Sequence, residues 1–429
     1  MKTLSMALLP LLLAAPAVHA AADSATGPYA DRIAKVLKAT PLIDGHNDWP
    51  EALTDKAKDQ RWTMALDRLD PATFHTDIAR LRDGGVGGQF WSVWVSADLP
   101  ELQQVQDTLE QIDLAHSFAR RYPRDFAFVT TAAQVRAAHK AGRVASMLGV
   151  EGGGQIDGSL AVLRSYRALG ASYLTLTHSR TIAWADSATD NPQHDGLTPF
   201  GEAVVHELNR LGMLVDLSHV SEATMLDALR VTKAPVIFSH SNARALCDTP
   251  RNVSDAVLQQ VAAKGGVVMV NFAPQYVSEA RRVWGAARSA EIARYNAPPF
   301  GGLYIGDPEG AKKALTDWEK ANPEPVVTLA QVADHIDHIV KIAGVDHVGI
   351  GSDFDGVGAL PQGLSGVETY PALLAELMRR GWSDRDIAKL AGENVLRVMA
   401  AAEKVAGEMA GEPAGSGTVA ALDGAKPTP

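Results

Sequence analysis

The chain has 429 residues, of which 46% are apolar and 21% are charged, as in an ordinary globular protein with a large core. The formal net charge of -10 and the scattered lysines and arginines exclude a basic face of the kind that binds nucleic acid or anionic lipid. The single cysteine, Cys247, excludes an internal disulfide, and its sequence context predicts a buried free thiol.

Residues 1–22 have the features of a secretory signal peptide. Lys2 is followed by an apolar run and then by small residues, so cleavage is expected near Ala20 or Ala22. A membrane anchor is the alternative, but the run is short for a membrane span and is broken by Pro10 and Pro16. We therefore expect an exported protein, periplasmic or secreted, with no membrane anchor in the mature chain.

Eight short apolar runs follow, and most of them are separated by an amphipathic segment of helical length. The runs span residues 41–48, 86–96, 143–153, 172–179, 213–221, 235–244, 265–274 and 347–356. Strands that alternate with helices indicate βαβ units, and eight such units favour a closed (β/α)8 TIM-like barrel over an open doubly wound sheet. No GxGxxG turn follows the first run, which argues against a dinucleotide-binding fold.

The predicted barrel spans 23–400. It contains one long insert and is followed by a C-terminal segment with few large apolar residues. The insert lies between the seventh and eighth strands, from about Gln275 to Pro325. Inserts of this length tend to be functional, so we expect a lid or a subunit contact. Residues 401–429 are rich in Ala, Gly, Pro, Ser and Thr and predict a disordered C-terminal tail.

Polar residues recur at the carboxyl ends of the predicted strands, which is where (β/α)8 barrels place their chemistry. The seven residues from six strands are His46, Asp48, Glu151, His178, His219, His240 and Asp353. A lone histidine at a strand end is more often a hydrogen-bonding residue than a metal ligand. That explanation would have to hold independently at every position, so we predict one metal site at the barrel mouth.

The motif DGHND sets the chemistry of this site. His46 and Asp48 are two residues apart on the first predicted strand, so both side chains point the same way and can share one metal ion. A set of three histidines and two carboxylates suits zinc, with Co, Mn or Ni as alternatives. Five ligands exceed what one catalytic zinc usually takes, so two metals that share a bridging carboxylate fit better.

Several stretches resemble the membrane dipeptidase (renal dipeptidase) family of zinc-dependent dipeptidases. They are DGHND, EGG, LTHSRTIAWAD, GMLVDLSHVS, PVIFSHSNAR, RNVSD, GGVVMVNF and HVGIGSDFDG, in family order from residue 44 to about residue 356. The resemblance implies a (β/α)8 barrel, in agreement with the strand count. It also implies a zinc metallopeptidase that hydrolyses dipeptides with a free C-terminal carboxylate. Whether D-residues are accepted at the C-terminal position stays open.

The resemblance also implies a ligand set for two zinc ions per chain. By position, His46, Asp48 and Glu151 would hold one zinc. Glu151, His219 and His240 would hold the other, with Glu151 as the bridge.

The remaining roles also follow from the resemblance. His178 would contact the substrate carbonyl, and Arg251, in RNVSD, would bind the terminal carboxylate. Asp353 would move the proton after attack by a metal-bridging hydroxide. Gly154 stands where relatives often carry a histidine, so a contact near Glu151 is expected to differ.

Two other interpretations remain open. Another metal-dependent amidohydrolase, such as a lactonase or cyclic amidase, is one, although no lysine ends a predicted strand to bridge two metals. A catalytically inactive periplasmic binding relative is the other, and the complete ligand set together with Asp353 argues against it. The partner cysteine of the mammalian enzymes is missing, so any homodimer is expected to be non-covalent.

Overall fold

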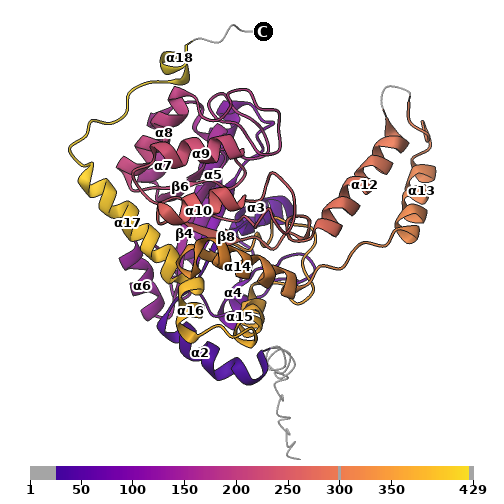
Figure 1. Cartoon of the computed structure of the whole chain (residues 1–429), viewed down its shortest axis with the longest axis horizontal. Coiled ribbons are helices and arrows are strands. Elements are labelled where there is room, and N and C mark those ends of the chain that lie inside the picture. Colours follow the sequence, from indigo (N-terminus) through magenta and orange to yellow (C-terminus); the bar gives the residue numbers. More distant parts are fainter. Residues whose placement is uncertain (1–25, 298–300, 425–429) are drawn as a thin grey trace, which may run out of the picture.

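The computed structural model describes residues 26–297 and 301–424, and the predicted signal peptide lies outside the described residues. Strands lie at its centre, with helices around them (Figure 1). Eight of the strands pair in parallel to form a closed ring. The ring strands are β1 (Leu42–Asn47), β2 (Val86–Trp94), β4 (Val144–Glu151), β5 (Ala171–Thr175), β6 (Leu214–Asp216), β7 (Ile237–Phe238), β8 (Val267–Val270) and β9 (Val348–Ile350). They are neighbours in the order β2-β1-β9-β8-β7-β6-β5-β4, and β4 pairs with β2 to close the ring. The predicted (β/α)8 barrel is confirmed.

One short strand, β3 (Phe126–Phe128), was not predicted. It pairs in parallel with residues 144–146 of β4, whereas β5 pairs with residues 148–151 of the same strand. β3 therefore extends the sheet below β5 without entering the ring.

The strands are apolar on both faces because both faces are covered. Every residue of β4 and of β8 is buried, as expected for a parallel sheet that packs on helices outside and on side chains inside. Ile43, Phe90, Met147, Tyr173 and Met269 come from five different ring strands and belong to one buried cluster. Side chains from strands on opposite sides of a ring meet only inside it, so this cluster fills the barrel.

Helices surround the ring, and several begin at side-chain caps that the sequence supplies. Ser159, Ser221 and Ser254 each accept a hydrogen bond from a backbone N–H in the first turn. The surrounding helices are α2 (Ala30–Ala39), α3 (Trp49–Ala57), α4 (Ile78–Asp83), α5 (Glu101–Arg121), α6 (Ala132–Lys140), α7 (Leu160–Ala168), α8 (Pro199–Leu211), α9 (Glu222–Val231), α10 (Asp255–Ala263), α14 (Leu329–Ala343), α15 (Tyr370–Arg379), α16 (Asp384–Ala388) and α17 (Asn394–Glu408). None of the helices in the described part of the chain has the length and hydropathy needed to cross a membrane.

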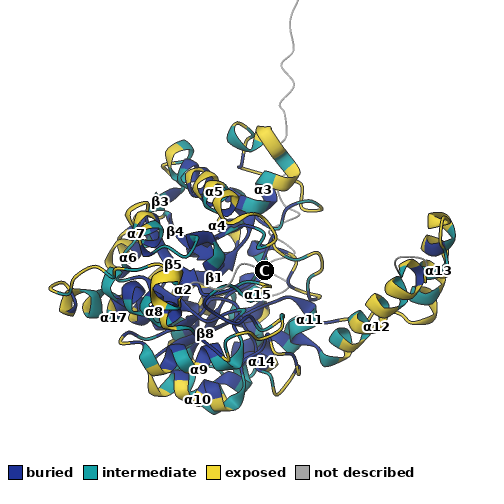
Figure 2. Cartoon of the chain, turned by 90° about the horizontal axis from the view of Figure 1, so that it is seen from above, coloured by how far each residue is buried: buried dark blue, intermediate teal, exposed yellow. Residues whose placement is uncertain are grey.

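The predicted insert between the seventh and eighth ring strands forms a helical arm. α11 (Pro274–Val277) leads into α12 (Glu279–Asn296), and α13 (Pro308–Ala321) returns beside it. Figures 1 and 2 show that α12 and α13 project away from the barrel. Trp284 and Trp318 lie with ring centroids 6.1 Å apart and hold the two helices together.

The C-terminal part differs from the predicted disordered tail. α17 runs through residue 401 to Glu408, and α18 (Val419–Leu422) follows. Gly415 donates its backbone N–H to Glu207 on α8 at 3.1 Å, and Asp423 accepts from Thr198 at 2.7 Å. Composition alone misled here because alanine is a good helix former, and because polar contacts with the barrel can hold a segment that has little apolar surface. Residues 425–429 lie outside the described residues.

Glu207 is the centre of this C-terminal contact. Its side chain is buried and accepts hydrogen bonds from Arg210 at 2.6 and 2.8 Å and from Arg164 at 3.0 Å. Burial alone would raise the pKa of Glu207, but the hydrogen bonds from Arg210, Gly415 and Arg164 bring it down to about 2. A carboxylate with a lowered pKa stabilises the fold above its unfolded pKa, and this contribution is lost as the pH falls from about 4.5 to about 2.

We expect Glu207→Gln to lower the free energy of unfolding by about 1–3 kcal/mol at pH 7, because two partly buried cations lose a buried partner. Urea unfolding of the variant and the parent should give a difference that shrinks as the pH approaches 2. The matched control is Glu202→Gln on the same helix, whose partner Arg230 is exposed. An exposed pair contributes little, so this control should unfold almost like the parent. Equal stability of Glu207→Gln and the parent at pH 7 would contradict the prediction.

Candidate metal centre

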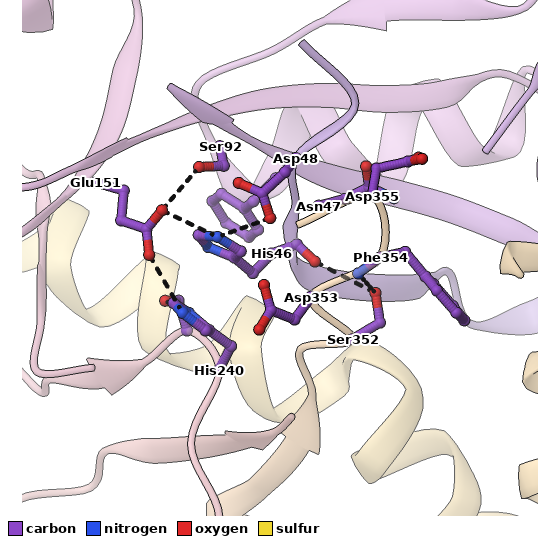
Figure 3. A network of polar contacts seen from close by, with 12 residues as sticks. His46, Asn47, Asp48, Ser92, Glu151, His240, Ser352, Asp353, Phe354 and Asp355 are labelled. Atoms are coloured by element: carbon purple, nitrogen blue, oxygen red, sulfur yellow. Dashed lines mark hydrogen bonds and ion pairs between the residues drawn. The ribbon is translucent and has the colours of Figure 1, made fainter. Parts of the chain in front are cut away.

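The seven residues predicted at strand ends come together at the carboxyl end of the barrel, and Figure 3 shows the part around Glu151. His46 lies in β1, and Glu151 is the last residue of β4. The other five, Asp48, His178, His219, His240 and Asp353, lie in the segments that directly follow β1, β5, β6, β7 and β9.

Glu151 lies between two groups of possible ligands. Its Oε1 is 3.0 Å from Nε2 of His219 and 3.3 Å from Nε2 of His240. Its Oε2 is 3.4 Å from Nε2 of His46, and the same nitrogen is 3.4 Å from Oδ2 of Asp48. One carboxylate therefore faces a histidine pair with one oxygen and a histidine–aspartate pair with the other.

His178 and Asp353 complete the ring of donor atoms. Three overlapping groups have donor atoms that all lie within 4.8 Å of one another; they are His46–Glu151–His240, Glu151–His178–His219 and His46–Asp48–Asp353. His178 Nε2 is 3.9 Å from Glu151 Oε1, farther than the other histidines, and its side chain is 21% exposed. It therefore lies at the open side of the cluster.

Hydroxyl groups fix the tautomers of two histidines. Nδ1 of His46 is 2.9 Å from the Tyr173 hydroxyl, which also donates to the carbonyl of Gly45. Nδ1 of His240 is 2.8 Å from Ser239 Oγ, which donates to Asp216 at 2.6 Å. Each hydroxyl donates its only proton to another acceptor, so it must accept a hydrogen bond from the imidazole. Each Nδ1 therefore carries a proton. With the proton of the neutral ring on Nδ1, Nε2 is the nitrogen of each ring that can serve as a metal ligand.

Charge at the site favours a bound cation. Burial and the charge of Arg251 lower the pKa values of His219 and His240 well below the ordinary value, so both rings are neutral near pH 7. Burial alone would raise the pKa of Glu151, but the neighbouring histidines hold it well below its usual value. Nε2 of His46 is buried without a hydrogen-bond partner among the described residues. Burial alone would lower the pKa of His46, but Tyr173, Glu151 and Asp48 raise it well above its ordinary value. A divalent metal bound among these carboxylates would take the place of the proton on Nε2 of His46.

Asp353 is an acid of a different kind. Burial, and next the charge of Asp48, raise the pKa of Asp353 to about 7. Its Oδ2 accepts a hydrogen bond from Asn271 Nδ2 at 2.8 Å. A carboxyl group with this pKa can both take and release a proton near neutral pH.

The backbone is strained where it carries these groups. His219, Asp353 and Asp355 have φ angles of 69°, 68° and 67°, in the left-handed region that few residues other than glycine adopt. Such strain collects at functional sites, where the surrounding structure enforces it.

Gly356 leaves the space that two of the carboxylates occupy. A Cβ at this position would lie 2.2 Å from Asp48 Oδ2 and 2.9 Å from Asp353 Oδ1. We expect Gly356→Ala to displace both carboxylates and to weaken metal binding by about 10- to 100-fold, the usual cost of disturbing the support of a ligand. Competition with a chromogenic chelator measures this. Gly358→Ala is the control, because a Cβ there meets nothing within 4 Å. Equal metal affinity of the two variants would refute the steric argument.

Arg251 lies behind the metal ligands. Its guanidinium is fully buried, donates from Nη1 to Ser241 Oγ at 2.6 Å and from Nη2 to the carbonyl of His240 at 2.8 Å, and stacks 5.5 Å from the Tyr276 ring centroid. Its Nε has no hydrogen-bond partner among the described residues. Arg251 is thus rigidly placed beside the site, with the Nε–H and the second N–H groups of Nη1 and Nη2 to spare.

Other residues around the site were not predicted from the sequence. A cavity of about 210 Å³ at the metal centre is lined by Glu51, Trp94 and Tyr276 besides the candidate ligands. Trp94 ends β2, and Asn271 follows β8, so the rule that chemistry sits at strand ends could have found both. Glu51 lies one helical turn beyond Asp48 and carried no strand-end signal.

The structure also shows the surroundings of Cys247 and Gly154. Cys247 is a buried free cysteine, as predicted, and burial raises its pKa to about 12. A Cβ at Gly154 would lie 2.8 Å from Gln104 Oε1, so Gln104 occupies the space where a side chain at this position would begin.

Comparison with known proteins also indicates a metal-dependent enzyme. The sequence profile of the membrane dipeptidases (peptidase family M19) matches residues 30–412. The chain belongs to the membrane dipeptidase family. It is similar to the probable dipeptidase PvdM from Pseudomonas aeruginosa, with a TM-score of 0.75 and 25% identity over 89% of this chain and 99% of that one. It is also similar to a metallopeptidase from Rhodobacter sphaeroides liganded with a phosphinate mimic of L-Ala-D-Ala, with a TM-score of 0.69 and 26% identity over 85% and 99%.

The family and the donor set agree on the class of chemistry. This membrane dipeptidase is a hydrolase of a metallopeptidase family, and its histidines and carboxylates form a candidate metal site at the mouth of a (β/α)8 barrel.

Proposed function

We propose that the protein is a binuclear zinc dipeptidase of the membrane dipeptidase type, acting on dipeptides with a free C-terminal carboxylate. The observation that carries the proposal is the place of Glu151, whose two oxygens face two separate groups of nitrogen and oxygen donors. A single catalytic zinc seldom takes five protein ligands, whereas two metals that share a carboxylate use all of them.

The proposed ligands divide into two sets. His46, Asp48 and Glu151 would hold one zinc, and Glu151, His219 and His240 would hold the other. When bound, the two metals would lower the pKa of a water molecule toward neutrality and polarise the scissile carbonyl. The hydrogen bonds of Tyr173 and Ser239 support this division because they hold the rings of His46 and His240 with Nε2 toward Glu151.

The remaining residues would handle protons and developing charge. His178, at the open side of the cluster, would donate a hydrogen bond to the substrate carbonyl as it gains negative charge. Asp353 would accept the proton of the attacking water and pass it to the leaving amine. Its pKa of about 7 and its fixed contact with Asn271 support this role.

Arg251 would recognise the terminal carboxylate of the substrate, through the Nε–H and the N–H groups that Ser241 and His240 leave unused. We expect dipeptide amides to be much poorer substrates than dipeptides. Arg251→Ala should lower kcat/KM by about one to two orders of magnitude, since a charged hydrogen bond contributes about 1.5–3 kcal/mol. Arg251→Lys should recover only part, because an ammonium lacks the planar fork. Equal cleavage of amides and acids by the parent protein would assign Arg251 another task.

A chelator experiment tests the proposed function. Purified protein, treated with chelator and then given zinc in steps, is assayed with L,L- and L,D-dipeptides. D-residues are included because a similar metallopeptidase binds a mimic of L-Ala-D-Ala. We expect activity to vanish with the metal and to return fully near two zinc ions per chain. Full activity at one zinc would refute the binuclear site. Cleavage of lactones or cyclic amides but not dipeptides would favour another amidohydrolase, and no cleavage would favour a binding protein.

Two further proposals concern the setting of the enzyme. The signal-like sequence of residues 1–22 supports export to the periplasm or the medium. We also propose that any homodimer is non-covalent, because the only cysteine is buried.

A further inference from the structure

A second cavity opens beside the metal centre. It has a volume of about 280 Å³, room for several water molecules, and it shares Glu51 and Trp94 with the cavity that contains the candidate ligands. Its other walls come from α3, from the segment after β2 and from α5. A group that enters this cavity therefore stays next to the reacting bond.

The walls of this cavity are acidic. Glu51, Asp55, Asp107 and Glu110 line it, and the one lining cation is Arg61. Arg61 is already engaged, because its guanidinium nitrogens lie 3.6 Å from Glu110 and 4.0 Å from Asp59. Among the residues that the structure describes, none donates a hydrogen bond to the carboxylate of Glu51 or Asp55. Burial, and next the charge of Asp48, raise the pKa of Glu51 to about 9, so near pH 7 the negative charge that the protein does not neutralise comes mainly from Asp55 and Asp107.

Gln111 gives an independent sign of a missing ligand. It lines the cavity, is only 8% exposed, and donates from Nε2 to the carbonyl of Trp94 at 2.5 Å. Its Oε1 is buried and has no hydrogen-bond partner among the described residues. A buried acceptor without a donor is costly, so the unpaired oxygen fits a ligand that brings N–H groups.

The barrel order sets which end of a dipeptide reaches this cavity. Arg251 is tied to His240 and Ser241, just after β7, whereas Trp94 ends β2. In the closed ring β2 and β7 are separated by four steps in either direction, so they lie on opposite sides of the barrel mouth. A dipeptide with its carboxylate at Arg251 and its peptide bond at the metals would extend its N-terminal residue toward Trp94.

We propose that this acidic side pocket binds the side chain of a basic N-terminal residue, so that the enzyme prefers dipeptides that begin with lysine or arginine. This inference rests on the proposed dipeptidase function. The aliphatic stem of such a side chain would pass Trp94, Val95 and Leu99, and its charged end would meet the carboxylates of Asp55 and Asp107. Both basic side chains carry donors for the free oxygen of Gln111.

The test compares three substrates that differ only in the N-terminal side chain: Lys-Ala, norleucyl-Ala and Glu-Ala. Norleucine keeps the stem of lysine and lacks the charge. With the zinc-loaded full chain we expect kcat/KM for Lys-Ala to exceed that for norleucyl-Ala by about tenfold and that for Glu-Ala by more. The ratio of Lys-Ala to norleucyl-Ala should fall as salt is added, because an attraction between charges is screened.

Matched variants locate the effect. Asp55→Asn and Asp107→Asn should each lower the Lys-Ala to norleucyl-Ala ratio by about threefold or more. Asp59→Asn is the control, because Asp59 is exposed and does not line the cavity, and it should leave the ratio unchanged. The ratio cancels general losses of activity, so a variant that is merely less stable does not imitate the expected result.

The outcomes separate the inference from the function on which it rests. Cleavage of all three dipeptides with equal kcat/KM, or ratios that no pocket variant changes, would overturn the acidic side pocket and leave the dipeptidase intact. A preference for Ala-Lys over Lys-Ala would overturn the orientation. Failure of the zinc-loaded protein to cleave any of these dipeptides would refute the proposed function, and the pocket assignment with it.

Discussion

Replacement of Glu151 by alanine should remove both metals and abolish hydrolysis. Its two oxygens face both proposed ligand sets, so its loss removes a donor from each of them. A carboxylate between two dications also offsets their mutual repulsion. We expect kcat/KM to fall by at least about three orders of magnitude, since metal polarisation and water activation together contribute several kcal/mol. Metal analysis of the purified variant should find well under one zinc per chain.

Three milder variants serve as controls for Glu151→Ala. His219→Ala and His240→Ala should each empty mainly one site and keep about one zinc. Ser92→Ala removes only the hydroxyl that donates to Glu151 Oε2 at 3.1 Å, so it should keep both metals and lose about 10- to 100-fold in activity. If Glu151→Ala retained one tightly bound zinc and His219→Ala none, Glu151 would not be the bridge.

Replacement of Asp353 by asparagine should leave both metals bound and slow the chemical step. Asparagine keeps the shape of the side chain and its oxygen can still accept the hydrogen bond from Asn271, but the amide cannot take a proton. A positioned general acid–base contributes about 10²–10⁴-fold. We therefore expect kcat to fall within that range, with KM and zinc content nearly unchanged.

Asp355 is the matched control for Asp353. It is two residues along the chain, yet its carboxylate accepts the backbone N–H of His75 at 2.8 Å, and Figure 3 shows it turned away from Glu151. Asp355→Asn keeps an oxygen for this hydrogen bond, so its effect on kcat should be much smaller. Loss of a zinc from Asp353→Asn, or a larger loss of kcat in Asp355→Asn, would reject the proton-transfer role.

The contrast between these two aspartates marks a limit of sequence reasoning. On a regular strand, residues two apart point the same way. The rule holds for His46 and Asp48, whose Nε2 and Oδ2 are 3.4 Å apart, because Asp48 directly follows the last residue of β1. It fails at Asp353 and Asp355 because β9 ends at Ile350 and both residues have left-handed φ angles. Strand geometry no longer applies there, and contacts with Asn271 and His75 decide where each carboxylate points.

Local sequence patterns determined the fold of this protein and the position of its candidate ligands. Apolar runs separated by amphipathic segments are sufficient to predict a parallel barrel, because strand burial and helix amphipathicity are written in the residue order. Once a barrel is predicted, its symmetry brings all strand ends to one rim, so the seven polar residues at those ends could be placed together from the sequence.

Tertiary structure alone decided what depends on contacts between distant segments. Residues 401–424 look weakly apolar in sequence, but Glu207 and Thr198 of another part of the chain hold them on the barrel. The acidic side pocket forms because α3 and α5 meet beside the end of β2, which brings Glu51 and Gln111 to one cavity. Neither residue carries a local signal, since a cavity is a property of how elements pack and not of the order of residues within any one of them.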